Sequence, residues 1–420
     1  MPGVLLLLSL FTSIASGFLP PKHKSRFSVS HAHGEKIIVI GKIILDKYGN
    51  PYDRDLDETK VAIGGGGPQS AFGACAALAA RDVLGWNDED REQVLVRVTD
   101  ATASPPKQNV IFVAPIGLKN WTPEMTTSLH SLLPMLKAPP TLVSSLDHVT
   151  PTIHIWHDEN ETVNWTPVNE SFGEMGADSL WRINLIDDIL DKIEKHDENV
   201  VLHIILQCGH NSTGSGFDAL PLFNSPIMER VSAASIEPIL FPNEYGIISH
   251  EDVSKTCDFF NEVIDYASDL SQATNRTKKL VLVSPDRPCY DALCSISESS
   301  QNATAVMKAI EFAIRDGSNG SIIVDNGSTT TTTTTLFPPA TLKTNDSKPV
   351  NPTGAGNAYA GAYAACRGTG SSIEEAACIA NAVGAVVCEH EHLPPWTWEV
   401  LERVVEGACE VRSKSKRSGQ

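Results

Sequence analysis

The string from Pro349 to Gly361, P-V-N-P-T-G-A-G-N-A-Y-A-G, constrains the fold of this 420-residue chain more than any other segment. Its centre, Gly354, Ala355 and Gly356, comes directly before a run of small residues that predicts a helix. The first N–H groups of a helix have no partner within the helix, and the helix dipole adds about half a positive charge beside them. Glycine lets a ligand approach these N–H groups closely. The string therefore predicts an anion site of the kind that binds phosphate.

Several strings along the chain are similar to parts of one protein family. The string above resembles the C-terminal signature of the PfkB/ribokinase-like carbohydrate kinases, D-T-x-G-A-G-D-x-[FY]-x-x-G. Other resembling segments follow in the family's order: the first strand with its glycine and aspartate (Lys36–Asp46), the diglycine before an alanine-rich helix (Ile63–Leu78), a core strand (Phe112–Gly117), the metal and phosphate segment (Phe241–Glu244), the strand before the nucleotide pocket (Ile322–Gly327) and the helix beside the adenine (Ala380–Cys388). The resemblance implies an α/β fold, a ribokinase-like three-layer sandwich with a mostly parallel central sheet and a small β-lid.

The resemblance also implies cofactors, a substrate class and site residues. ATP and Mg²⁺ are the expected cofactors, and a sugar or sugar-like alcohol is the expected acceptor. The implied residues are Asp46, Gly65, Gly66 and Gln69 for the acceptor, Gly354, Ala355, Gly356 and Asn357 for the transferred phosphoryl group, Asn243, Gly327, Thr353 and Asn381 for the nucleotide, and Glu244 for the metal.

The chain departs from the family pattern where the chemistry matters most. The aspartate that acts as the family's catalytic base is Asn357 here, the first residue of the signature is Asn351, the asparagine of the first signature is Gln69, and Glu244 directly follows Asn243. An amide can orient a hydroxyl but cannot take its proton. Base assistance of that kind raises a rate by about 10²- to 10⁴-fold.

Two functions therefore stay open. One is an ATP-dependent phosphotransferase, slowed by the missing base or assisted by another acid. The other is a catalytically inactive regulatory protein that binds a nucleotide or a sugar. The candidates for a general base in place of position 357 are Asp46, Asp325 and Asp346.

The net charge bears on the class of partner, and the cysteine and histidine residues bear on disulfide bonds and metal sites. A net charge of −18 argues against nucleic acid, because phosphate backbones are bound by basic patches. The cysteines form no C-x-x-C pair and are interpreted as free thiols of a reducing compartment, with a Cys289–Cys294 pair in a loop as the alternative. The string Glu389–His392, E-H-E-H, is interpreted as a solvated loop rather than a metal site, and His203 as a core or loop histidine.

The first 35 residues predict a presequence. Val4–Gly17 is an apolar segment that ends in small residues, as in a signal peptide, and the following stretch is basic, serine-rich and free of acids, as in a transit peptide. We therefore expect delivery to a plastid by the secretory route, with secretion as the alternative, which the N-x-[ST] sequons would fit. No membrane attachment is expected after its removal. Residues 36–410 would form the kinase domain, and residues 411–420 a solvated basic tail.

Apolar runs predict buried strands with helices between them. The predicted strands are Lys36–Leu45, Val110–Ile116, Val200–Cys208, Ile236–Phe241, Lys279–Ser284 and Ser321–Asp325, and the predicted helices are residues 69–84, Ser179–His196 and Val253–Leu270. This alternation is typical of a parallel sheet that is covered on both faces. The threonine run Thr329–Thr335 fits either a strand or a flexible loop.

A hairpin signal precedes the middle of the chain. The alternating strings Ile153–His157 and Thr162–Trp165 flank a polar turn. The resemblance implies that this hairpin and a second segment form the lid, at residues 150–167 and 47–62, and a homodimer through the lid is compatible with it. Trp156 and Trp165 would either stack on a ligand or pack within the lid.

Overall fold

The computed structural model of the protein describes residues 35–48, 61–84, 104–145, 149–157, 163–167, 189, 199–208, 220–240, 248–274, 280–297, 301–326, 332–344 and 348–418. The predicted presequence lies outside these residues except for its last position, as do most of the predicted helix Ser179–His196 and the predicted site residues Asn243, Glu244 and Gly327.

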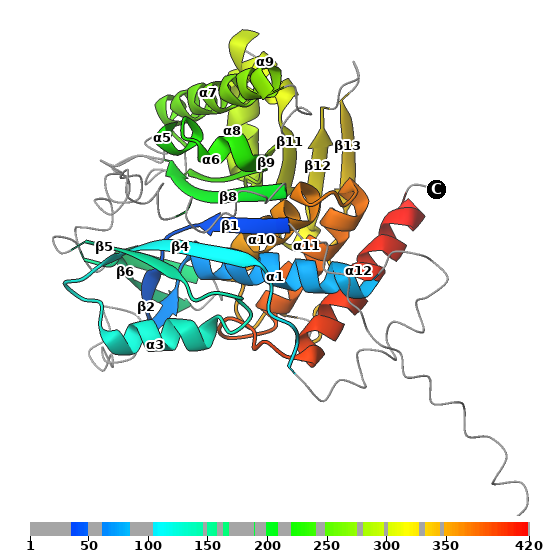
Figure 1. Ribbon diagram of the computed structural model, residues 1–420. Coiled ribbons are helices and arrows are strands. Elements are labelled where there is room, and N and C mark those ends of the chain that lie inside the picture. The colour runs from blue at the N-terminus through cyan, green and yellow to red at the C-terminus, as the bar shows by residue number, and fades with distance from the viewer. Residues whose placement is uncertain are drawn as a thin grey trace, which may run out of the picture. The chain divides into compact units, whose positions relative to one another are not determined.

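A nine-stranded, mostly parallel sheet forms the centre of the fold (Figure 1). In spatial order its strands are β13 (Thr333–Phe337), β12 (Ser321–Asp325), β11 (Glu311–Arg315), β10 (Leu280–Val283), β9 (Val231–Leu240), β8 (Asn199–Cys208), β1 (Glu35–Ile40), β4 (Val110–Gly117) and β5 (Thr141–Ser145). At one edge, β12 pairs antiparallel with both β11 and β13, and the other described pairs of this sheet are parallel. The predicted α/β class with a mostly parallel sheet is confirmed.

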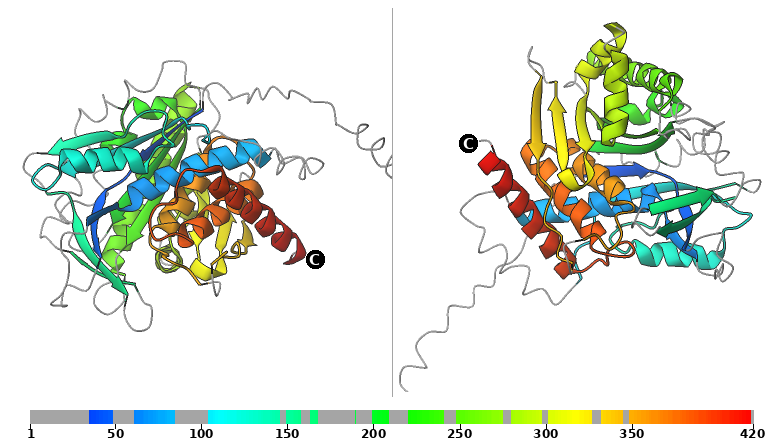
Figure 2. Two further views of the ribbon diagram at one scale, coloured as in Figure 1. Left: turned by 90° about the horizontal axis from the view of Figure 1, so that it is seen from below. Right: turned by 180° about the vertical axis from the view of Figure 1, so that it is seen from behind.

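Helices cover both faces of this sheet, as Figures 1 and 2 show. One layer contains α1 (Gly66–Leu84), α10 (Ala355–Gly368), α11 (Ile373–Cys388) and α12 (Trp398–Ser418), and the other contains α5 (Leu220–Phe223), α6 (Ile227–Arg230), α7 (His250–Thr274), α8 (Arg287–Ser297) and α9 (Gln301–Ala309). Successive side chains of a strand point to opposite faces. In β1, Ile37 and Val39 accordingly join the core under α1 and α10, whereas Ile38 and Ile40 join the core under α7 and α8.

A second, four-stranded sheet has the order β3-β2-β6-β7, with β2 (Ile44–Tyr48), β3 (Val61–Gly64), β6 (Thr152–His157) and β7 (Val163–Pro167). The hairpin predicted around residues 153–165 is confirmed, because β6 and β7 pair antiparallel. The single strand predicted for Lys36–Leu45 is wrong: the run divides into β1 in the large sheet and β2 in the small one. The division falls at Gly41, where a Cβ atom would lie 2.8 Å from the Cα atom of Gly67.

One further prediction differs from the structure, and two alternatives that the sequence left open are decided by it. The tail predicted to begin at residue 411 is helical through Ser418 in α12, because Val411 is buried and Arg412 pairs with Glu374. Cys289 and Cys294 lie on α8 as free thiols rather than in a disulfide-bonded loop. The threonine run enters a strand, β13, from Thr333.

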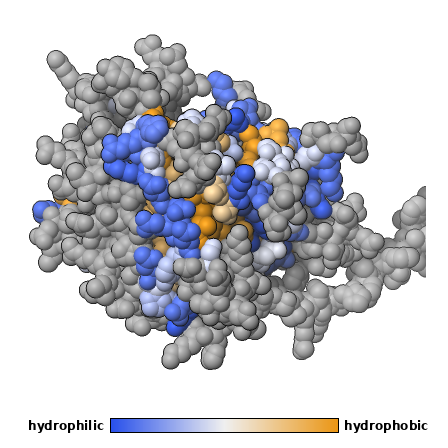
Figure 3. Space-filling view, turned by 90° about the horizontal axis from the view of Figure 1, so that it is seen from above, coloured by the Kyte–Doolittle hydropathy of each residue, from blue (hydrophilic) through white to orange (hydrophobic). Residues whose placement is uncertain are grey.

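The face seen from above carries hydrophobic side chains between hydrophilic ones (Figure 3). Within the described ranges, the helices include none that combines the length and the apolar character needed to cross a membrane.

Two glycines bring α1 and α10 into close contact. A Cβ atom on Gly73 of α1 would lie 2.0 Å from the carbonyl oxygen of Ala358, and a Cβ atom on Gly361 of α10 would lie 2.2 Å from the carbonyl oxygen of Ser70. No side chain fits at either place, so the two backbones touch directly. The hydroxyl of Ser70 also donates to the carbonyl of Asn357, at 2.8 Å. The first turns of α1 and α10 are thereby held side by side.

We predict that Gly361→Ala destabilises the protein by about 2–3 kcal/mol, because the methyl group would force the two backbones apart. Gly384→Ala in α11 is the matched control, since its Cβ atom would meet its nearest neighbour at an ordinary 3.5 Å. Alanine favours a helix over glycine, so this control is expected to be neutral or stabilising by up to about 1 kcal/mol. Urea unfolding measures both, and equal effects would contradict the close contact.

Candidate active site

Three of the predicted site segments converge at the first turns of α1 and α10. Added Cβ atoms measure how close they are. On Gly64 such an atom would lie 1.8 Å from Oδ2 of Asp46, on Gly66 it would lie 2.7 Å from Nδ2 of Asn357, and on Gly354 it would lie 2.3 Å from Cδ of Gln69. The structure therefore brings together residues that are about 300 positions apart in the sequence.

The backbone of both turns needs glycine. Gly65, between β3 and α1, has a φ of 93°, and Gly354, the N-cap of α10, has a φ of 83°. Both values lie in the left-handed region, which residues with a Cβ atom adopt at an energetic cost. These two glycines shape the connections that bring Gly66 beside Asn357 and Gly354 beside Gln69.

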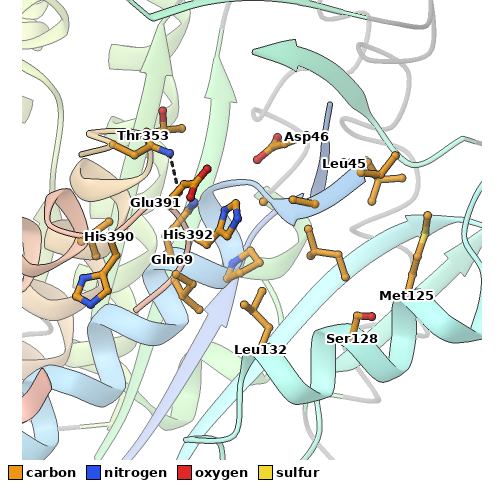
Figure 4. A pocket seen from close by; sticks show the side chains of 18 residues that line it. Leu45, Asp46, Gln69, Met125, Ser128, Leu132, Thr353, His390, Glu391 and His392 are labelled. Atoms are coloured by element: carbon orange, nitrogen blue, oxygen red, sulfur yellow. Dashed lines mark hydrogen bonds between the residues drawn. The ribbon is translucent and has the colours of Figure 1, made fainter. Parts of the chain in front are cut away.

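A pocket of about 260 Å³ opens beside this junction. Figure 4 shows Asp46 and Leu45 of β2 in the upper part of the view, Gln69 of α1 to the left, and Met125, Ser128 and Leu132 of α3 (Pro123–Leu132) at the lower right. Asn351 and Thr353 from the turn before α10 also line it. The pocket thus combines apolar walls with carboxylate, amide and hydroxyl groups, which is the composition of a site for a small polar ligand.

The string Glu389–His392 lies in a loop, as predicted, and this loop borders the pocket. Glu391 and His392 are exposed, as a solvated loop requires, but His390, Glu391 and His392 line the pocket beside α10. Glu389 pairs with Arg403 at 2.8 Å, and the backbone carbonyl of Glu391 accepts from the side-chain amide of Asn351 at 2.8 Å. No cluster of three or more His, Cys, Asp or Glu side chains that could hold a metal occurs among the residues described here.

The N–H groups at the start of α10 are only partly available. The N–H group of Ala355 donates to the carbonyl of Pro352 at 3.2 Å, and its predicted role at the anion stays a prediction. Thr353 donates to Oδ1 of Asn351 at 2.9 Å. The N–H groups of Gly356 and Asn357 have no partner within the described part of the chain. They remain suited to an anion.

A buried ionic cluster lies beneath Asn357 and was not predicted. Glu237 of β9 has no solvent exposure, and its Oε1 atom accepts from Nδ2 of Asn357 at 2.7 Å and from Nη1 of Arg315 of β11. Arg315 lies directly under the first turn of α10, because a Cβ atom on Gly356 would lie 2.8 Å from its Nη1 atom. The Nε atom of Arg315 has no partner among the described residues.

His203 of β8 completes the cluster. It is fully buried, as predicted for a core histidine, and its Nδ1 atom is 3.0 Å from the hydroxyl of Ser235. Its Nε2 atom lies 3.9 Å from Oε2 of Glu237, and neither atom has a hydrogen-bond partner in the described residues. Burial, and then the positive charge of Arg315, lower the pKa of His203 to about 3, so the ring is neutral. Burial raises the pKa of Glu237, against the opposing effect of Arg315.

A sequence signal for this cluster does exist. Glu237 and Arg315 are charged residues near the carboxyl ends of buried strands, the edge at which parallel sheets bind ligands. A charge in such a strand must be paired, because an unpaired buried charge is strongly unfavourable. Ile236–Phe241 was predicted as a strand without this conclusion, and residues 311–315 were not assigned as a strand.

Asn381 lies apart from this junction. It is buried in α11, where its side-chain amide donates to the hydroxyl of Ser321 at 2.8 Å and to the carbonyl of Ala377 at 3.0 Å. Its side chain links α11 to β12, and the role predicted for it at a nucleotide stays a prediction.

Burial also raises the pKa of Asp46 to about 7. Between the two pKa values, Asp46 is protonated in the folded chain but ionised in the unfolded chain, where its pKa is near 3.8. The contribution of Asp46 to the free energy of unfolding is therefore at its full value below about pH 4, and it is lost as the pH rises through about 7. We predict that Asp46→Asn flattens this fall, measured by urea unfolding between about pH 4 and 8. Asp291→Asn on the surface of α8 is the control, and an unchanged pH dependence in Asp46→Asn would contradict the prediction.

Comparison with known proteins identifies the family signature and the fold. Residues 265–394 match the pfkB family of carbohydrate kinases. None of the curated proteins compared with the chain matches it. The structure is similar to that of Arabidopsis thaliana ribokinase complexed with ribose and ATP, with 14% sequence identity, 88% of this chain and 98% of that chain covered, and a TM-score of 0.53.

Two nucleoside kinases are similar in the same way. That of Burkholderia thailandensis in complex with inosine is 11% identical, covers 89% of this chain and 97% of its own, and has a TM-score of 0.53. That of Methanocaldococcus jannaschii, an archaeal member of the ribokinase family, is 15% identical, covers 88% and 98%, and has a TM-score of 0.51. The predicted resemblance to the PfkB/ribokinase-like carbohydrate kinases is therefore confirmed, in the fold over most of the chain and in the family signature over residues 265–394.

Proposed function

We propose that the chain is an ATP-dependent phosphotransferase that acts on an alcohol group of a sugar or sugar-like substrate. One observation carries this proposal: the start of α10, with two N–H groups that have no partner in the described residues, adjoins a pocket lined by Asp46 and Gln69. An anion site and a site for a hydroxyl-bearing ligand thus share one junction. The ribokinase fold supports this reading, and so do the ligands of two similar proteins, ribose with ATP and inosine, which all carry ribose hydroxyls.

The residues at the junction suit both halves of such a transfer. ATP, when bound, supplies the phosphoryl group. The N–H groups of Gly356 and Asn357 and the guanidinium of Arg315 suit its negative charge, which is the main requirement of phosphoryl transfer. Asp46 in its ionised form and Gln69 can accept hydrogen bonds from the hydroxyl groups of an acceptor.

The transfer also requires ligands for Mg²⁺ and a group that takes the proton of the acceptor hydroxyl. The residues that the resemblance implies for Mg²⁺ and nucleotide, Asn243 and Glu244, lie outside the described residues, and no described residue is assigned to the metal. In the transfer, a bond forms between the acceptor oxygen and the γ-phosphorus, the bond from that phosphorus to the bridging oxygen breaks, and ADP leaves. The Asn357 amide cannot take the hydroxyl proton, so that proton passes to the phosphoryl oxygens, to water or to another acid such as Asp46.

Asn357 also supports a second function. With Asn357 at the base position and its amide bound to Glu237, a regulatory protein that binds a nucleotide or sugar without turnover is the alternative. The two functions differ in one measurement. We predict that ATP with Mg²⁺ raises the unfolding temperature and that ADP forms only when an alcohol from a panel of sugars and nucleosides is added. A thermal shift without ADP formation from any acceptor would favour the regulator.

The junction itself can be tested by a matched pair of glycine variants. Gly354 and Gly370 both have left-handed backbones, with φ values of 83° and 95°. Each alanine variant should therefore lose about 1–2 kcal/mol of stability. Only in Gly354→Ala does the methyl group collide with Gln69, since no atom of the described residues lies within 4 Å of the Cβ position at Gly370. We predict that Gly354→Ala alone loses the ligand-dependent thermal shift and the ADP formation, and equal losses in both variants would contradict the site.

A further inference from the structure

The side chains of Glu237, Arg315 and His203 reach the same face of the sheet. Ala233 of β9, Ala313 of β11 and Val201 of β8 lie in the core under α10, and the alternation of a strand places every second residue beside them. Glu237, Arg315 and His203 are an even number of positions from these residues. Three strands thus present polar groups to the first turn of α10, among side chains that are otherwise small and apolar.

The hydrogen bond from Asn357 to Glu237 fixes the orientation of the amide. Oε1 of Glu237 accepts from Nη1 of Arg315 and therefore carries no proton of its own, so the group of Asn357 that lies 2.7 Å from it is the NH₂ group. The Oδ1 atom of Asn357 then faces away from Glu237. A hydroxyl group of a ligand at the start of α10 would meet a hydrogen-bond acceptor there.

The charges around Glu237 are few and can be named. Arg315 of β11 donates to it, Asn357 of α10 donates to it, and His203 of β8 faces it as a neutral ring. Asp286, in the segment after β10, is a further carboxylate among the described residues that acts on the pKa of Glu237, which it raises. Among these neighbours, Glu237 is the carboxylate in contact with position 357.

We propose that Glu237 holds the negative charge that position 357 lacks, and that it acts on the acceptor as a positioning residue through Asn357. This inference rests on the proposed function for its effect on turnover, but not for its effect on stability. It has a direct consequence. An aspartate at position 357 would not simply restore a base, because its carboxylate would lie about 2.7 Å from that of Glu237, and two carboxylates at such a distance cannot both ionise.

Four proteins test the proposal: the wild type, Asn357→Asp, Glu237→Gln and the double variant Asn357→Asp/Glu237→Gln. The double variant exchanges the charge between the two positions and keeps one carboxylate in the pair. We expect Asn357→Asp to lower the unfolding temperature more at pH 8 than at pH 5, because one of the two carboxyl groups is protonated at the lower pH. The double variant should regain most of this loss.

A control separates the charge pair from a general effect of a buried aspartate. Asn381→Asp places the same substitution in α11, where the side chain contacts Ser321 and Ala377 rather than a carboxylate. Addition of Glu237→Gln should not rescue Asn381→Asp. Absence of rescue in Asn357→Asp/Glu237→Gln, or equal rescue of the control, would overturn the proposal whether or not any protein forms ADP.

Turnover gives the second readout. We expect Glu237→Gln to lower kcat for ADP formation by about tenfold or more, because Asn357 is no longer held by a charge-assisted hydrogen bond, with KM for ATP within about twofold. Asn357→Asp alone should not exceed the wild type, and the double variant should exceed both single variants. A rise of kcat in Asn357→Asp alone would overturn the proposal. If no variant, wild type included, forms ADP while the stability rescue holds, the phosphotransferase assignment fails and the charge exchange stands.

Discussion

The direct contact between the backbones of α1 and α10 is the constraint on which the rest of this site depends. Gly73 and Gly361 leave no room for a side chain at the two points of contact. Because the helices meet so closely, their first turns open at one place. Asp46 and Gln69 reach that place from the N-terminal part of the chain, and Asn357 reaches it from the C-terminal part. A wider spacing would separate an anion site from the pocket beside it.

The sequence was informative wherever a short string determines the local structure. The glycines at 354 and 356 predicted the start of α10, and the apolar runs predicted β4, β8, β12 and most of α1 and α7. The prediction from sequence failed where one apolar run contributes strands to two different sheets. Lys36–Leu45 is apolar and β-branched throughout, and only Gly41 indicates the change from β1 to β2. That glycine is required by the approach of α1, which a reading of neighbouring residues cannot show.

The ionic cluster was missed for a related reason. Glu237 stands in the string Val231–Leu240, V-S-A-A-S-I-E-P-I-L, which looks like an apolar strand with one exposed charge. Its partners, Arg315 and Asn357, come 78 and 120 residues later. No local pattern connects the three. The same holds for the second buried pair, in which Glu311 accepts from Arg367 at 2.7 Å and from the hydroxyl of Tyr363 at 2.7 Å.

The position of the carboxylate has a consequence for the anion site itself. A carboxylate at position 357 would lie in the first turn of α10, where it would offset the positive end of the helix dipole. With Asn357 there, the charge of Glu237 lies below the turn and is bound to Arg315, whose Nη1 atom also adjoins Gly356. The start of α10 thus keeps the positive potential of its helix dipole. The guanidinium of Arg315 lies beside it, and the charge of this guanidinium is neutralised by Glu237 beneath the turn. This arrangement favours the binding of a phosphoryl group over the removal of a proton, which is consistent with slow transfer and with binding alone.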